Sequence, residues 1–299
     1  MTKAAKGKSP FYVGQPVPVK FFIGRQNELK KIMRAIGQVE HGKQQAVFLT
    51  GEHGIGKSSL AGYMRRYAEK YHHILGIHLL LGSAKTIEDV AAKTVDALVK
   101  TRHPNQAVTD AIREFLSKYT IADAALGINI DVETLRADSA GLANGFLPLL
   151  HELTSRLHGH GIRGVMLIMD EINWIASNQQ FPHFLKALID ENGLSSAPLP
   201  ILLMLCGVEE KRQEMIGNYQ PIERVFNIID LKPFNDDDMK AFFTKTFNAA
   251  GMKVKDEALS GLCHYSAGLP RIMHVIGDNV FWVDNDNVID GEDVTKGIF

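Results

Sequence analysis

One glycine-rich segment has the residue types and the spacing of a phosphate-binding loop. Residues 51–58, Gly-Glu-His-Gly-Ile-Gly-Lys-Ser, fit the pattern G-x-x-x-x-G-K-[ST]. Glycines let backbone N–H groups turn towards phosphate oxygens, Lys57 brings a positive charge to the β- and γ-phosphates, and the Ser58 hydroxyl can bind Mg²⁺. An apolar run at 45–50 precedes the loop and a helical pattern at 57–71 follows it, which is the context this chemistry requires. The segment therefore predicts a nucleotide site.

Two acids follow a second apolar run, Val165-Met-Leu-Ile-Met-Asp170-Glu171. Such a run predicts a buried strand that exposes carboxylates only at its carboxyl end, where ligands bind in parallel sheets. Asp170 would hold Mg²⁺ through its water shell, and Glu171 would polarise the attacking water. The presence of both acids beside a phosphate loop predicts hydrolysis of the nucleotide as well as its binding.

Alternating strands and helices are expected to position these motifs. Continuous apolar strands separated by helices predict an α/β fold, with a parallel sheet covered on both faces. Residues 120–132 are ambiguous between a short hairpin and an edge strand. The expected strands cover 45–50, 74–81, 164–169, 201–206 and 226–231, and the expected helices cover 28–39, 57–71, 86–100, 142–157 and 181–189.

After Pro233 the pattern becomes helical. Asn235 precedes Asp238 by three residues, which is the spacing of a helix cap, and apolar residues follow it at helical spacing. Two more helical patterns, 258–266 and 272–281, have no strand between them. We therefore expect three parts: a basic N-terminal arm at 1–20, an α/β nucleotide-binding core at 21–233, and a small all-helical lid at 234–299.

Composition excludes several classes of protein. Of the 299 residues, 45% are apolar and 22% charged, which is typical of a globular chain and not of a disordered or fibrous one. The net charge of −1 argues against a protein that coats nucleic acid or a membrane with its whole surface. No apolar run approaches the length of a membrane span, no secretory signal follows the charged N-terminus, and two cysteines make no disulfide framework. We expect a soluble cytoplasmic protein with no membrane contact.

Charge is unevenly distributed along the chain. Residues 1–27 carry five basic side chains and no acid, whereas residues 234–299 carry eleven acids and six bases. The basic arm is either a solvated terminus or a local contact for a phosphate backbone or a partner.

Together these motifs resemble the AAA+ ATPases, within the group that holds origin-recognition-like, transposition-regulator and STAND-like proteins. Residues 21–29, Phe-Phe-Ile-Gly-Arg-Gln-Asn-Glu-Leu, look like that group's N-terminal motif F-[IV]-G-R-x-x-E-L, which borders the adenine in the family. Residues 268–271, Gly-Leu-Pro-Arg, resemble the sensor-2 signature G-x-P-R, whose arginine reaches the γ-phosphate. The resemblance covers about residues 12–280. It implies a three-layer P-loop core with five strands in the order 5-1-4-3-2, and a lid packed over ATP.

The resemblance also implies an arginine that enters the neighbouring protomer's site, and hence a homo-oligomer. Arg224, just before the fifth expected strand, occupies the matching place. A planar cation there would stabilise charge on the transferred phosphoryl group. The alternative is a surface arginine paired with Glu223 or Asp230, and Arg212 is the second candidate for the role.

One position departs from the family pattern. The family places Asn, Ser or Thr at the end of the fourth strand to orient the lytic water, and this chain has Cys206 there. A thiol is a poor hydrogen-bonding substitute, so hydrolysis is expected to be slow or to depend on a partner. Cys206 otherwise has the properties of a small buried apolar residue.

The resemblance and the motifs together define the expected site, with ATP and Mg²⁺ as its ligands. The expected catalytic residues are Glu171, Arg224 and Arg271, and the expected metal ligands are Ser58 and Asp170. The residues expected to contact ATP are Ile23, Gly24, Gly51, Gly54, Ile55, Gly56, Lys57, Ser58, Ser59, Pro270 and Arg271.

Three roles remain open for such an ATPase. The first is a regulator that assembles on DNA in transposition or replication, which the family group and the basic arm favour. No recognisable DNA-binding domain follows the lid in this sequence and the net charge is near zero, and both observations argue against this role. The second is a signalling or anti-phage defence ATPase that acts through a protein partner, and the third is a nucleotide-stabilised adaptor with no meaningful turnover.

Overall fold

The computed structural model describes residues 6–15, 22–117 and 139–299, with the backbone alone at 139–144. The ambiguous segment 120–132 lies outside these ranges. The chain forms two compact units. The sheet unit comprises residues 27–50 and 64–230, and the helical unit comprises the residues up to Gln26, residues 51–63 and residues 231–299.

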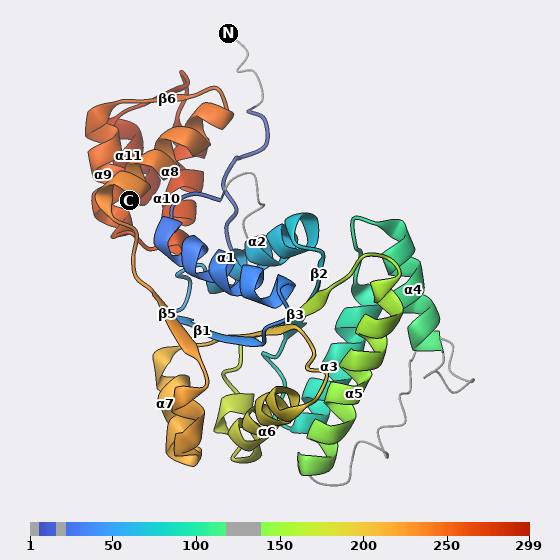
Figure 1. The fold of residues 1–299 in the computed structure, drawn as a ribbon. Helices are drawn as coiled ribbons and strands as arrows, with labels where there is room; N and C mark the ends of the chain where they lie inside the picture. The colour runs from blue at the N-terminus through green and yellow to red at the C-terminus, as the bar shows by residue number, and fades with distance from the viewer. Residues whose placement is uncertain (1–5, 16–21, 118–138) are drawn as a thin grey trace. The chain divides into compact units, whose positions relative to one another are not determined.

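A five-stranded parallel sheet forms the centre of the sheet unit, in the order β2-β3-β4-β1-β5 (Figure 1). This is the predicted order 5-1-4-3-2 seen from the other edge. Met169 pairs with Leu205 and Leu49 pairs with Cys206, so β3, β4 and β1 end at the same edge of the sheet. The strands are β1 (Gln45–Gly51), β2 (Ile74–Leu80), β3 (Gly164–Asp170), β4 (Ile201–Cys206) and β5 (Asn227–Leu231).

Helices cover both faces of this sheet, as the continuous apolar strands predicted. In Figure 1, α1 lies on one face, and α3, α5 and α6 lie on the other. Alternate residues of β2, among them Leu75 and Ile77, belong to one core with the apolar sides of α3, α4, α5 and α6. The helices are α1 (Gln26–Glu40), α2 (Lys57–Tyr71), α3 (Ile87–Lys100), α4 (Gln106–Ser117), α5 (Ser139–His158), α6 (Gln180–Leu194) and α7 (Glu209–Asn218), with short 3₁₀ turns η2 (Ile175–Ser177) and η3 (Gln220–Arg224).

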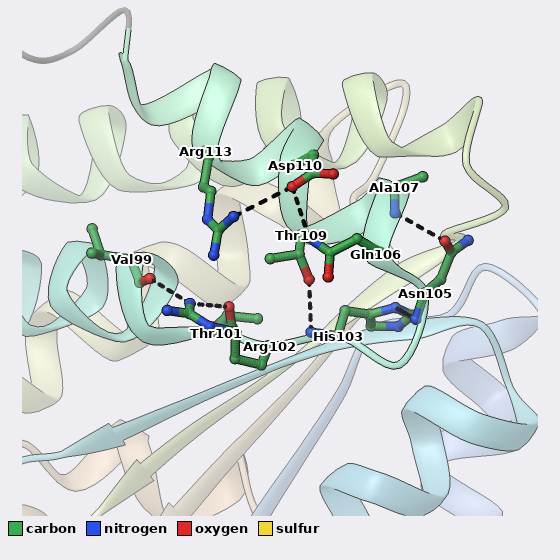
Figure 2. Close-up of polar contacts among 10 residues, drawn as sticks. All are labelled: Val99, Thr101, Arg102, His103, Asn105, Gln106, Ala107, Thr109, Asp110 and Arg113. Carbon is green, nitrogen blue, oxygen red and sulfur yellow. Dashed lines mark hydrogen bonds and ion pairs between the residues drawn. The ribbon is translucent and has the colours of Figure 1, made fainter.

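The turn between α3 and α4 is held by side chains that replace missing backbone partners (Figure 2). The N–H of His103 donates to Thr109 Oγ1 at 3.0 Å, and the N–H of Asn105 donates to His103 Nδ1 at 3.1 Å. The Asn105 side chain accepts from the N–H of Ala107, the second residue of α4. Sequence analysis missed α4, although the cap and the helical spacing of Val108, Ile112 and Phe115 are both present in the sequence.

Four helices and a short strand pair make up most of the helical unit. They are α8 (Asp236–Ala249), α9 (Asp256–Ser266), α10 (Pro270–Val283) and α11 (Gly291–Ile298), with β6 (Lys253–Val254) parallel to β7 (Val288–Ile289). The predicted cap is confirmed, because the Asn235 side chain accepts from the N–H of Asp238 at 2.8 Å. Gly268 has a φ of +72°, and an added Cβ would lie 2.3 Å from the carbonyl oxygen of Phe234. Only glycine fits between α9 and α10 at this point.

Residues 6–15, which we call the N-terminal segment, pack onto this helical unit. Lys6 pairs with the buried carboxylate of Asp284 at 3.4 Å. Phe11 is 6% exposed and meets the Phe247 ring edge-on, with the ring centroids 4.9 Å apart. The described part of the basic arm thus belongs to the core of the helical unit, an arrangement that neither sequence interpretation of the arm anticipated. Within the described ranges, no helix has the length and apolar content needed to cross a bilayer.

Candidate nucleotide site

The predicted phosphate loop follows β1 and ends where α2 begins. Gly51, Gly54 and Gly56 all have positive φ, at +142°, +80° and +99°. These angles are strained for other residue types, which explains the three glycines. The Lys57 ammonium donates to the carbonyl oxygens of Gly51 and Glu52, both at 2.8 Å. The lysine charge is therefore held at the loop itself.

The arginine of the lid signature lies against this loop. The N–H of Arg271 donates to the carbonyl oxygen of Gly54 at 3.2 Å. A Cβ on Gly54 would lie 2.9 Å from the Cβ of Arg271, so a side chain at Gly54 would displace the arginine. Pro270 is the first residue of α10, a position where the missing N–H costs nothing. The structure thus brings together two motifs that sequence analysis found more than two hundred residues apart.

Arg25 connects the N-terminal motif to the phosphate loop. This side chain is 7% exposed, and its Nη2 donates to the carbonyl oxygen of Ile55 at 3.1 Å. Its Nη1 donates to the carbonyl oxygen of Lys232, and its guanidinium lies 4.5 Å from the centroid of the Phe234 ring. Sequence analysis used Arg25 to recognise the motif but assigned it no contact. Its contacts indicate that Arg25 orients the phosphate loop and the segment around Lys232 and Phe234.

A small pocket with a cavity volume of about 40 Å³ lies beside the loop, entirely within the helical unit. Phe22, at one side, stacks on Tyr63 with the ring centroids 4.7 Å apart. Five predicted residues line the pocket, namely Ile23, Ile55, Gly56, Ser59 and Pro270. Sequence analysis missed the other five, Phe22, Arg25, Phe234, Phe242 and His274. An apolar, partly aromatic pocket that shares residues with a phosphate loop suits a flat base joined to phosphates.

The predicted acidic pair lies in the sheet unit, at the end of β3. Asp170 is 1% exposed, and its Oδ1 accepts from the N–H of Glu171 at 2.9 Å. Nε2 of His78, on the neighbouring strand β2, donates to Oδ2 of Asp170 at 3.1 Å. Glu171 is exposed with a φ of +57°, and its carboxylate lies over Gly82, where an added Cβ would come within 2.5 Å of Oε2. Sequence analysis missed His78 because only the pairing of β2 with β3 brings it to Asp170.

Cys206 is fully buried at the end of β4, and its carbonyl oxygen accepts from the N–H of Ile172 at 3.3 Å. Three residues later, the Glu209 carboxylate pairs with Arg212, with Oε1 2.6 Å from Nη2. The same carboxylate accepts from Oγ1 of Thr50, the residue before the phosphate loop, at 3.4 Å. Hydrogen bonding to Arg212 lowers the pKa of Glu209. Arg212, the second candidate for the trans arginine, is therefore engaged within its own chain.

Arg224 is in a different situation. It is the last residue of η3 and its side chain is exposed. It makes no ion pair with any residue that the structure describes, Glu223 and Asp230 included. The exposed Arg224 guanidinium is accessible to a second molecule. Arg212 could contact a second molecule only after breaking its ion pair with Glu209.

The predicted site residues divide between the two units. The phosphate loop, Ile23, Gly24, Pro270 and Arg271 belong to the helical unit, and Asp170, Glu171 and Arg224 belong to the sheet unit. Gly24 has a φ of +73°, and an added Cβ would lie 3.0 Å from Asp238. No group of three or more histidine, cysteine, aspartate or glutamate side chains within the described ranges could hold a metal ion.

The sequence profile of a family described as "AAA ATPase domain" matches residues 22–204 of this chain. A comparison with curated proteins finds no match.

Solved structures share the fold at low sequence identity. The ORC2 protein of Aeropyrum pernix, in ADPNP-ADP complexes, is 12% identical with a TM-score of 0.64, over 96% of this chain and 69% of that one. The RuvB Holliday junction branch migration motor of Thermotoga maritima is 18% identical with a TM-score of 0.54, over 93% and 69%. The Aeropyrum pernix ORC1 protein in complex with DNA is 13% identical with a TM-score of 0.56, over 95% and 66%. At these identities, the similarity concerns the fold.

Proposed function

We propose that this chain, which belongs to the AAA ATPase family, binds ATP with Mg²⁺ and hydrolyses it in a way that is coupled to assembly. The single observation that carries the proposal is the arrangement of the helical unit, where the phosphate loop lines an aromatic pocket and accepts a hydrogen bond from the Arg271 backbone. The adenine would occupy the pocket and the phosphates would lie over the loop. The amino end of α2 would add its positive dipole end to the charge of Lys57.

The residues present fit a magnesium nucleotide. Gly56 has a positive φ, and an added Cβ would meet nothing within 4 Å, so the loop has an open side where a phosphate can approach. Ser58 and Asp170 would hold Mg²⁺, with phosphate oxygens and water completing the coordination. The bound ion would withdraw negative charge from the phosphate oxygens.

Each side chain then has a distinct task. Lys57 and Arg271 would bind and orient the phosphates, and Glu171 would accept the proton of the attacking water. His78 would hold the Asp170 carboxylate in place, since its Nε2 already donates to one of the two oxygens. The family resemblance implies that both sets of residues act on one nucleotide, and we propose the same for this chain.

Turnover is expected to be slow in the isolated protein. Cys206 is fully buried, and a thiol is a weak group for orienting water. An exposed Arg224 supports a shared site, in which the arginine of one protomer completes the site of the next. We propose a homo-oligomer on this basis, with residues 21–233 as its core, 234–299 as its lid, and 1–20 as the arm.

The role that we favour is a regulator that assembles on DNA, of the transposition or replication type. Two of the structures with this fold are described as an ORC1 protein in complex with DNA and a Holliday junction motor, which supports this choice. The alternative is a signalling or anti-phage defence ATPase that acts on a protein partner. A nucleotide-stabilised adaptor without turnover is the third candidate, and the buried thiol of Cys206 is the observation that favours it.

ATP turnover, measured with and without double-stranded DNA over a range of salt and protein concentrations, tests these roles. DNA stimulation that fades as salt rises would support assembly on DNA, because phosphate contacts weaken with salt. A rate per protomer that rises with protein concentration and ignores DNA would support the protein-partner alternative. No turnover under any condition, with intact ATP binding, would favour the adaptor. Lys57→Ala is the control, and ATP binding by that variant with unchanged affinity would contradict the assignment of the loop.

A further inference from the structure

His274 is placed in the candidate base pocket by the fold alone. It lies on α10, three residues after Arg271, and it is 5% exposed. It lines the pocket with Phe22, Phe234 and Phe242, and its ring meets the Phe242 ring at 90°, with centroids 4.9 Å apart. Apolar packing therefore fixes the ring on one side, and the pocket adjoins it on the other.

The N-terminal segment determines which ring nitrogen of His274 carries the proton. The backbone N–H of Tyr12 donates to Nδ1 at 3.2 Å. Because a backbone N–H can only donate, Nδ1 must be the unprotonated nitrogen. Burial lowers the pKa of His274 to about 4, so the ring is neutral at physiological pH and carries its one proton on Nε2.

This Nε2–H has no partner among the residues that the structure describes. Nε2 is not one of the fully buried side-chain atoms that lack a partner, so it is accessible from the pocket, where water or a ligand normally supplies the acceptor for such a donor. The surrounding pocket walls are largely aromatic and aliphatic side chains, which do not accept hydrogen bonds well. An acceptor carried into the pocket by a ligand would satisfy the group.

We propose that His274 recognises the base of the nucleotide, by donating a hydrogen bond from Nε2 to a ring nitrogen of adenine. This inference rests on the proposed function and adds a specificity-determining residue to it. The adenine ring has three acceptor nitrogens, N1, N3 and N7, and the proposal requires that one of them meets the donor. The N-terminal segment then takes part in base recognition indirectly, because Tyr12 keeps Nδ1 unprotonated.

Three ATP analogues, each with N1, N3 or N7 replaced by C–H, test the proposal by calorimetric measurement of affinity. Wild-type protein should bind one analogue roughly tenfold more weakly than ATP and the other two within about twofold, because only one nitrogen faces the donor. His274→Phe should bind ATP as weakly as wild type binds that one analogue, and should no longer distinguish the two. His274→Gln, which keeps a side-chain N–H, should recover part of the difference. His264→Phe replaces an exposed histidine of α9 and should change none of the affinities.

The outcomes separate this inference from the function on which it rests. Wild-type protein that binds ATP and all three analogues equally would overturn the role of His274 and leave ATP binding in place. Wild-type protein that binds none of them would overturn both. Should His274→Phe fail to fold, nitrogen NMR of the wild-type ring replaces it. A proton on Nε2, with a resonance that shifts on binding ATP but not on binding the weak analogue, supports the proposal. A proton on Nδ1 contradicts it.

Discussion

Replacing Gly277 by alanine should release the N-terminal segment from the helical unit. Gly277 lies inside α10, and a Cβ added there would come within 2.2 Å of Cε1 and 2.5 Å of Cζ of Phe11. Both atoms belong to a rigid ring, and Phe11 is itself packed against Phe242 and Phe247. The ring therefore has to leave its site, since no rotation of a flexible chain end can relieve the contact.

The size of the effect follows from two opposing terms. Alanine in place of glycine inside a helix stabilises it by about 1 kcal/mol. Loss of a buried phenylalanine from a core costs about 3–5 kcal/mol. The net expectation is a loss of about 2–4 kcal/mol in the free energy that holds the segment in place. Amide exchange at Tyr12, whose N–H is bonded to His274, should accelerate by roughly 30- to 1,000-fold.

A double-mutant cycle in urea unfolding identifies the cause. In a Phe11→Ala background, the Gly277→Ala change should no longer destabilise, and should recover the helix-propensity term of about 1 kcal/mol. Gly37→Ala is the matched control, because Gly37 lies inside α1 and an added Cβ there would meet nothing within 4 Å. It should stabilise the protein slightly. If Gly277→Ala costs the same with and without Phe11, the steric explanation is refuted.

Three further predictions concern catalysis and pH. Glu171→Gln should keep ATP affinity and slow turnover by roughly 10²–10⁴, the usual contribution of a general base, and an unchanged single-turnover rate would mean that another group takes the proton. Arg224→Ala should lower ATP turnover, and mixing this variant with Lys57→Ala should restore part of the turnover. The reason is that mixed oligomers contain some sites with both an intact loop and an intact arginine. A steady-state rate of the mixture equal to the sum of the two separate variants would place the trans arginine elsewhere. Burial raises the pKa of Glu69 to about 7 from an ordinary value of 4.5, with Arg65 opposing the rise. Between pH 4.5 and about 7, folding is therefore accompanied by the uptake of a proton at Glu69. This group contributes about 3 kcal/mol to the free energy of unfolding below pH 4.5, and the contribution is lost as the pH rises through about 7. Urea midpoints should fall between pH 5 and pH 8 in the wild type and fall less in Glu69→Gln, and equal slopes would contradict a buried neutral carboxyl.

Local sequence patterns were sufficient to predict the strands and the phosphate loop. Apolar runs marked all five strands of the sheet to within two residues of their bounds, and the helix predicted at 57–71 has the same bounds as α2. The Asn235 cap and the glycines of the loop were also accessible, because helix caps, positive φ angles and phosphate contacts depend on residues within a few positions of one another. The family resemblance supplied the strand order, which no local pattern contains.

Contacts between side chains that lie far apart in the chain depend on how the strands and helices pack. His78 contacts Asp170 across 92 positions, and it does so because β2 pairs with β3 in this register. Tyr12 contacts His274 across 262 positions, and Arg25 reaches Lys232 across 207. No local sequence pattern around His274 or Arg25 predicts these contacts. The neighbouring residues of a helical histidine, or of an arginine after a glycine, do not depend on whether a distant partner is present. The physical reason is that packing and burial, which join distant segments, set the tautomer of His274, the conformation of Arg25 and the position of the N-terminal segment.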